Sequence, residues 1–158
     1  MVLVMLTSIL VSSFAVQSGG EGSQFNRGVG ADLVTEFVHK VRNDSPFYSL
    51  EAEFTYMPLF SARNIGVDEE WIDRLEENNP VSRRALSITR LVAGTPASEV
   101  LRNGDIVMAV DGQVVTSFRA LEKAAQKPEV TITIWRNSAV REIELQTAAL
   151  DGRGITLE

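Results

Sequence analysis

Hydrophobic and polar residues alternate along short segments in the second half of the chain, and this period of two predicts β-strands. The expected strands cover residues 47–59, 86–92, 106–110, 113–115, 130–135 and 139–146. Asp111-Gly112 separates two of them. Because a two-residue type I′ turn needs positive φ at both central residues, this pair predicts a tight hairpin.

Between these strands, hydrophobic residues recur at helical spacing. Residues 68–77 place Trp71, Ile72 and Leu75 on one helix face and acidic residues in the first turn, where the helix dipole favours them. Thr95 and Ser117 are expected to cap helices at 97–101 and 118–126, and residues 61–65 are expected to form a helical turn. The mixture of strands and helices predicts an α+β fold.

The N-terminal part of the chain is harder to assign. Residues 1–16 are apolar with Ser and Thr interspersed, which favours a buried strand. A secretory signal peptide is the alternative, although no basic residue precedes Arg27. The stretch is too short and too rich in hydroxyl groups to predict a membrane span. The Gly-rich residues 17–30 are expected to form a loop, and residues 33–41 a helix.

Composition narrows the chemistry open to the chain. Its 158 residues are 44% hydrophobic and 23% charged, which is a globular balance. The chain has no cysteine and one histidine, His39, which excludes disulfides, thiolate nucleophiles and sites that need two imidazoles. A net charge of −6 without clustered Lys and Arg argues against nucleic-acid binding. We therefore expect no metal, no cofactor and no nucleic-acid partner.

Four short motifs follow one another in residues 86–146. They are Gly94-Thr95-Pro96-Ala97, Leu101-x-x-Gly104-Asp105-Ile106, Val110-Asp111-Gly112 and Ser117-Phe118-x-x-Leu121. This segment resembles the PDZ domain of the HtrA (Do-like) serine protease family. The resemblance implies an α+β fold, namely a PDZ-like partly open β-barrel or sandwich with two to three helices, preceded by a remnant of a trypsin-like β-barrel.

Residues upstream resemble other parts of the same family. Asn26–Val34 is similar to the closing strand and terminal helix of the HtrA protease barrel, and residues 61–79 resemble the divergent two-copy proteases of fungi and plants. The resemblance implies a barrel remnant with its terminal helix at 1–44, a PDZ-like domain at 45–148, and a tail or linker at 149–158. The family's catalytic His, Asp and Ser have no matching positions, and His39 follows the barrel.

The resemblance also implies a peptide-binding groove, because PDZ domains add an extended peptide as a strand beside a sheet edge. One wall is expected to be Leu50, Glu51, Ala52, Glu53 and Phe54, and the other the helix face with Phe118, Leu121, Glu122 and Ala125. Phe118 and Leu121 either line the groove or pack in the core. Glu51 replaces the glycine of the family's carboxylate-binding loop, which disfavours capture of a free C-terminus. Internal extended segments, or an intramolecular strand, are at least equal candidates.

Two functions are open. The chain is expected to be a non-catalytic peptide-binding or regulatory module of an HtrA-like protease, with extended or unfolded polypeptide segments, or other domains of the same protein, as partners. The alternative is a fragment of a serine endopeptidase whose active unit lies elsewhere in a longer chain. We expect this chain alone to lack peptidase activity. The relatives favour an intracellular location, nuclear or organellar, over secretion directed by residues 1–16.

Overall fold

The computed structural model describes residues 8–18, 21–43 and 45–150, and the chain divides into two compact units between Pro46 and Phe47. The first unit contains a β-hairpin and a helix. Strands β1 (Ser8–Ser18) and β2 (Glu21–Gly30) pair antiparallel, and helix α1 (Ala31–Arg42) follows directly. The expected strand is present from Ser8 onward. The loop expected at residues 17–30 is wrong for residues 17–18 and 21–30, which are strand, because pairing of β1 with β2 outweighs a Gly-rich composition that gives no strand signal. Residues 19–20 lie outside the described part of the chain.

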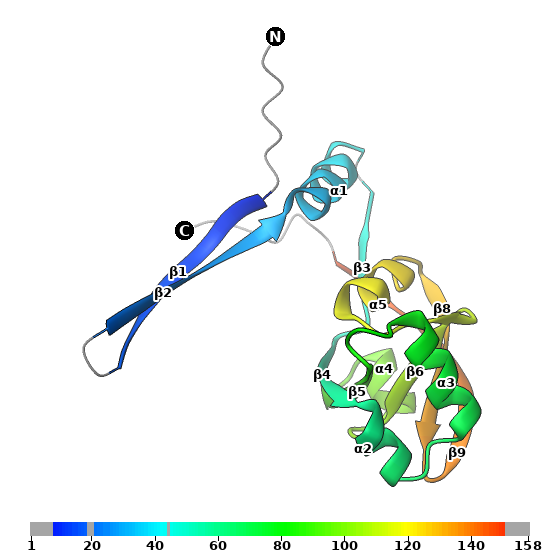
Figure 1. Cartoon of the computed structure of the whole chain (residues 1–158). Coiled ribbons are helices and arrows are strands. Elements are labelled where there is room, and N and C mark those ends of the chain that lie inside the picture. The colour runs from blue at the N-terminus through cyan, green and yellow to red at the C-terminus, as the bar shows by residue number, and fades with distance from the viewer. Residues whose placement is uncertain (1–7, 19–20, 44, 151–158) are drawn as a thin grey trace. The chain divides into compact units, whose positions relative to one another are not determined.

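The second unit is built on an antiparallel sheet whose path is β4–β5–β6–β8–β9, with β7 beside β6 (Figure 1). These strands are β4 (Ala52–Pro58), β5 (Arg84–Leu91), β6 (Ile106–Val110), β7 (Gln113–Val114), β8 (Glu129–Arg136) and β9 (Ala139–Gln146). The turn between β6 and β7 has φ of 47° at Asp111 and 75° at Gly112, which confirms the predicted hairpin.

A separate pair of short strands joins the beginning and end of this unit. Strand β3 (Phe47–Ser49) pairs antiparallel with β10 (Ala148–Leu150). The single strand expected at 47–59 is therefore two strands, because Glu51 has a φ of 50° and interrupts the extended backbone. The tail expected at 149–158 begins inside β10, and residues 151–158 lie outside the described part of the chain.

The second unit contains α2 (Leu59–Asn64), α3 (Glu69–Asn78), α4 (Pro96–Val100) and α5 (Phe118–Ala124), more than the two to three helices expected for it, since residues 59–64 form a helix. The two predicted caps are confirmed. Thr95 Oγ1 accepts from Ser98 N at 3.3 Å, and Ser117 Oγ accepts from Ala120 N at 3.2 Å. In the described part of the chain, no helix is long and apolar enough to cross a membrane.

Two hydrophobic clusters form the core of this unit. Ile106, Val107 and Met108 of β6 alternate between the two clusters, because successive strand side chains point to opposite faces of a sheet. The first cluster contains Val107 of β6 together with Leu101, which follows α4, and Leu121 of α5. The second takes Ile106 and Met108 and joins them to side chains of α2 and α3. The core thus fixes α5 relative to the sheet.

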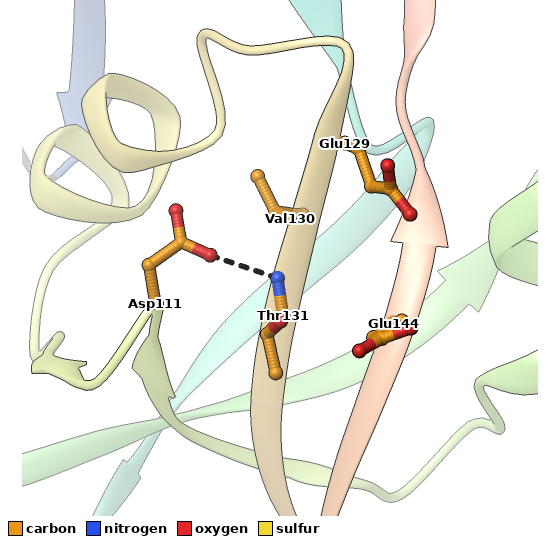
Figure 2. A pocket seen from close by; sticks show the side chains of 5 residues that line it. All are labelled: Asp111, Glu129, Val130, Thr131 and Glu144. Atoms are coloured by element: carbon orange, nitrogen blue, oxygen red, sulfur yellow. Dashed lines mark hydrogen bonds between the residues drawn. The ribbon is translucent and has the colours of Figure 1, made fainter.

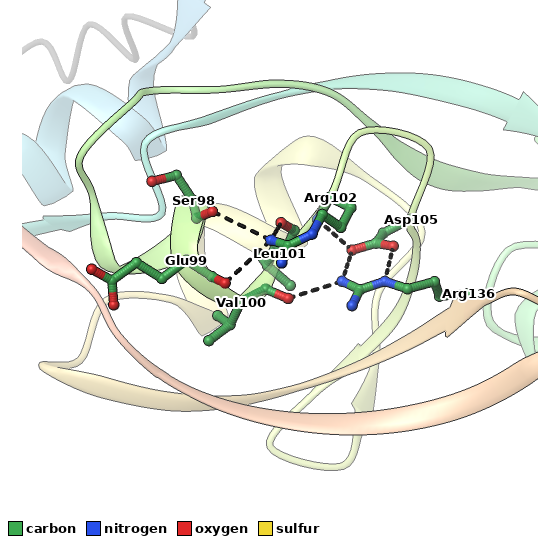
Figure 3. Close-up of polar contacts among 7 residues, drawn as sticks. All are labelled: Ser98, Glu99, Val100, Leu101, Arg102, Asp105 and Arg136. Atoms are coloured by element: carbon green, nitrogen blue, oxygen red, sulfur yellow. Dashed lines mark hydrogen bonds and ion pairs between the residues drawn. The ribbon is translucent and has the colours of Figure 1, made fainter.

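One buried ion pair closes the turn that follows α4 (Figure 3). The Asp105 side chain is 1% exposed; its Oδ1 accepts from Arg136 Nε at 2.7 Å, and its Oδ2 from Arg136 Nη2 at 2.5 Å. Arg136 also donates to the Val100 carbonyl at 2.9 Å, and Asp105 accepts from Arg102 N at 2.8 Å. The hydrogen bonds to Asp105 raise the pKa of Arg136. Both carboxylate oxygens of Asp105 therefore have hydrogen-bond partners within the fold.

Candidate functional site

Strand β4 has an open edge: among the described residues, no strand pairs with it on the side away from β5. Leu59 N donates to the Arg83 carbonyl at 3.0 Å, and Val92 N donates to the Glu51 carbonyl at 3.0 Å, so these bonds mark the two ends of the β4–β5 ladder. Antiparallel strands bond one neighbour through every second residue. The register therefore directs the backbone N–H and C=O groups of Ala52, Phe54 and Tyr56 toward the open edge.

Pro58 ends this open edge. It lies opposite Arg84 and follows the same alternation as Tyr56, so its backbone also faces away from β5. Proline has no N–H and cannot donate to an added strand. The usable edge therefore extends from Ala52 to Tyr56. Glu53 bonds inward to β5, and its exposed side chain pairs with Arg90 at 3.3 Å.

The loop between β3 and β4 lies at the other end of this edge. Glu51 takes the left-handed conformation that glycine adopts without strain. Its N–H donates to Ser49 Oγ at 2.9 Å, while its carbonyl accepts from Val92 N. The peptide groups around Glu51 are thus held by the loop itself and by the residue that follows β5.

Gln126, close after the end of α5, holds β3 beside this loop. Its Oε1 accepts from Tyr48 N at 3.3 Å, and its Nε2 donates to the Tyr48 carbonyl at 2.7 Å. The side-chain amide therefore bonds both backbone groups of one residue, as a neighbouring strand would. This contact connects the end of α5 to the start of the loop.

Aromatic side chains connect the other end of α5 to β4. The rings of Phe118 and Tyr56 have centroids 4.2 Å apart and planes 32° apart. The Arg84 guanidinium carbon lies 3.5 Å from the centroid of the same Tyr56 ring. Helix α5 therefore stands beside the open edge of β4 and is tied to it near Tyr56 and near the loop.

Comparison with known proteins identifies this unit. Residues 72–135 match the sequence profile of the PDZ domain family. The chain is 28% identical to the pro-apoptotic serine protease NMA111 of Yarrowia lipolytica over 142 residues, and 29% identical to Protease Do-like 7 of Arabidopsis thaliana over 162 residues. These alignments cover 87% and 88% of this chain. The chain is HtrA-like and contains a PDZ domain.

The structural comparison agrees on the fold. The HtrA-type protease AlgW, in a structure with a decapeptide, matches with a TM-score of 0.59 at 16% sequence identity, covering 91% of this chain and 42% of that one. The mixed α+β class expected from the sequence is thereby confirmed. The chain spans 14% and 15% of the length of the two curated relatives above.

The PDZ domain places the predicted site residues at different depths. Leu50, Leu121 and Ala125 are 6%, 2% and 2% exposed and belong to the first core cluster. Glu51, Ala52 and Phe54 are half-buried, whereas Glu53, Phe118 and Glu122 are exposed. Leu121 therefore packs in the core, and Phe118, 36% exposed, is a core-edge residue that reaches solvent.

Several residues at this edge carry no signal in the sequence. The contacts of Tyr56 with Phe118, of Arg84 with Tyr56, and of Gln126 with Tyr48 join residues far apart in the chain. No local period or motif pairs them. Ser49 is the exception, because Ser and Thr hydroxyls commonly accept from a backbone N–H two residues ahead.

An acidic surface pocket lies away from this edge, lined by Asp111, Glu129, Val130, Thr131 and Glu144 (Figure 2). Asp111 Oδ1 accepts from Thr131 N at 2.8 Å, and Oδ2 accepts from Lys127 Nζ at 2.7 Å. These hydrogen bonds lower the pKa of the Asp111 carboxyl, with Lys127 the larger cause. Asp111 thus connects the turn between β6 and β7 to strand β8 through these hydrogen bonds.

Possible catalytic and metal-ligating groups are sparse in the residues described. No group of three or more His, Cys, Asp or Glu side chains there could hold a metal ion. His39 is exposed on α1, with a ring nitrogen 3.1 Å from Asn43 Nδ2. Among the described residues, the open edge of β4 directs backbone hydrogen-bonding groups outward.

Proposed function

We propose that the PDZ domain binds an extended polypeptide segment as an added strand on the open edge of β4, and that the chain serves as a non-catalytic module of an HtrA-like protease. The observation that carries the proposal is the outward direction of the backbone groups of Ala52, Phe54 and Tyr56. PDZ domains take peptides by strand addition, with affinity from main-chain hydrogen bonds. The segment belongs to an unfolded substrate polypeptide or to another domain of the same protein.

Helix α5 supplies the second wall in this proposal. Phe118 and Glu122 are exposed and lie four residues apart on this helix, so they share one helix face. They offer an apolar and an acidic surface to ligand side chains, while Leu121 and Ala125 hold the helix against the core. Backbone pairing on β4 and side-chain contact with α5 would then act on the same ligand.

Backbone N-methylation of a ligand tests strand addition directly. A peptide selected from an unbiased display library against the full chain is resynthesised with one N-methyl group at each position in turn. Methylation at alternate positions should weaken binding about fivefold to tenfold, because each such group removes a hydrogen bond to β4. Positions between them should tolerate the change. Equal tolerance at all positions would contradict strand addition.

The second candidate function is that of a serine endopeptidase fragment, favoured by the names of the relatives above. In this proposal, residues 1–44 are the remnant of a protease barrel, which agrees with β1, β2 and α1 falling in a separate unit. We expect purified chain to leave unfolded casein intact. Hydrolysis that a serine-directed inhibitor abolishes would assign the activity to this chain.

A further inference from the structure

The loop beside Ala52 decides what kind of segment can continue past the open edge. A strand that pairs with Ala52 brings its next residue to Ser49, Leu50 and Glu51, because the loop directly precedes β4. The chemistry of this loop therefore selects between a ligand that ends there and one that continues. This inference rests on the proposed strand addition.

Capture of a terminal carboxylate needs backbone N–H groups that converge on it without other partners. In this loop the central N–H, that of Glu51, already donates to Ser49 Oγ at 2.9 Å. The N–H of Tyr48 donates to Gln126 Oε1. Two backbone donors of this segment, the N–H groups of Tyr48 and Glu51, are thus used within the fold.

Charge acts in the same direction. Glu51 is the only residue of the sequence from Phe47 to Ala52 whose side chain is charged at neutral pH. A carboxylate ligand would meet a like charge at short range, whereas an ammonium or guanidinium would meet an opposite one. Glu51 is half-buried, so solvent screens this interaction less than at a fully exposed site.

We propose that this PDZ edge selects internal extended segments that carry Lys or Arg where the segment passes Glu51, and that it discriminates against free C-termini. The left-handed backbone at Glu51 fits this role. Glycine would adopt that conformation without strain, and a glutamate there adds a charge at a conformational cost.

Two display libraries of random peptides test the proposal with the full chain. One presents internal segments tethered at both ends, and the other presents free C-termini. Internal segments with a basic residue at one recurrent position should be enriched. For a synthetic hit, replacing that basic residue by Glu, or ending the peptide there with a free carboxylate, should weaken binding about tenfold or more.

Protein variants assign the effect to one side chain. Glu51→Gln keeps the shape of the side chain and should reduce the preference for Lys over Glu to about twofold or less. Glu142→Gln, on exposed β9 at the opposite edge of the sheet, is the matched control and should keep the full preference. Glu51→Gly should in addition improve binding of peptides that end in a free carboxylate.

The outcomes separate this proposal from strand addition itself. Enrichment of free C-termini, or an unchanged charge preference in Glu51→Gln, overturns the assignment to Glu51 while strand addition stands. If neither library enriches any sequence, the proposed peptide-binding function fails, and this inference fails with it.

Discussion

The ring of Phe118 at the start of α5 stacks on the ring of Tyr56 in β4, with 4.2 Å between centroids. Tyr56 is the last residue of the open edge that has an N–H, so this contact stands at one end of the candidate site. Arg84 covers the same Tyr56 ring and links the contact to β5. Helix and edge strand are therefore coupled where a ligand strand would leave the site.

This stack should be measurable as a coupling energy. Phe118→Ala and Tyr56→Leu, alone and together, form a double-mutant cycle in chemical denaturation. We expect the two changes to be non-additive by about 0.5–1.5 kcal/mol, the usual range for aromatic pairs. Phe60→Ala is the control, because this ring is 64% exposed, and it should change the free energy of unfolding by less than about 0.5 kcal/mol. Additive effects would show that the rings do not interact in solution.

Burial should decide how much the ion pairs Arg136–Asp105 and Arg63–Glu69 contribute to the free energy of unfolding. Asp105→Asn removes the charge facing Arg136 inside the fold and should lower the free energy of unfolding by about 3 kcal/mol. Glu69→Gln breaks the pair with Arg63, which is similarly short at 2.6 Å but exposed to solvent, and should lower the free energy of unfolding far less than Asp105→Asn does. Similar losses in urea denaturation would contradict this ranking.

Asp111 should make part of the stability depend on pH. Its pKa is lower in the folded than in the unfolded chain, so the stabilisation is complete above the ordinary aspartate value of about 4. It is lost as the pH falls below that value. Asn, like Asp, tolerates the positive φ of this turn position. Asp111→Asn should therefore lower the free energy of unfolding by about 1 kcal/mol or less at pH 7. The difference in the free energy of unfolding between this variant and the parent protein, measured by urea denaturation, should become smaller below about pH 4. A difference that stays constant with pH would contradict the role given to Asp111.

Leu121 should behave as a core residue. Leu121→Ala should lower the free energy of unfolding by about 2–5 kcal/mol, since the side chain is 2% exposed and lies in the first core cluster. Leu121→Met should cost less than about 1.5 kcal/mol, because it nearly conserves volume. A small loss for Leu121→Ala, with peptide binding abolished, would place Leu121 in the groove.

Gln126 should protect one particular amide. Gln126→Ala removes the acceptor of the Tyr48 N–H, and amide exchange at Tyr48 should accelerate about tenfold. Gln126→Glu keeps an acceptor oxygen and should preserve more of that protection. Amide exchange at Val107 in β6 reports on unfolding of the whole domain. In both variants it should accelerate only as far as the loss of global stability requires. Equal acceleration at Tyr48 and Val107 would mean that only global stability has changed.

Local signals explain which parts of the fold could be predicted. The Asp111-Gly112 turn and the caps at Thr95 and Ser117 depend on residues within a few positions, and all three are present. Strand β2 and the break at Glu51 could not be predicted, because each depends on a partner strand or on a loop bond rather than on composition.

The same distinction applies to the candidate site. The resemblance to PDZ domains predicts that β4 and α5 form the walls of a groove, but the sequence cannot separate residues that would face a ligand from those that face the core. Leu121 and Phe118 lie one helical turn apart, yet their exposures are 2% and 36%. The contact of Gln126 with Tyr48 spans 78 residues and follows from tertiary packing.

Pro58 also affects how two copies of this chain could associate through the open edge of β4. An open sheet edge is a template for pairing with the same edge of a second molecule. Because Pro58 withholds an N–H at one end of β4 and Glu51 interrupts the other, two β4 edges could share only a short ladder. The residues that shorten the ladder open to a ligand strand would thereby also shorten any ladder between two copies, which disfavours self-association through this edge.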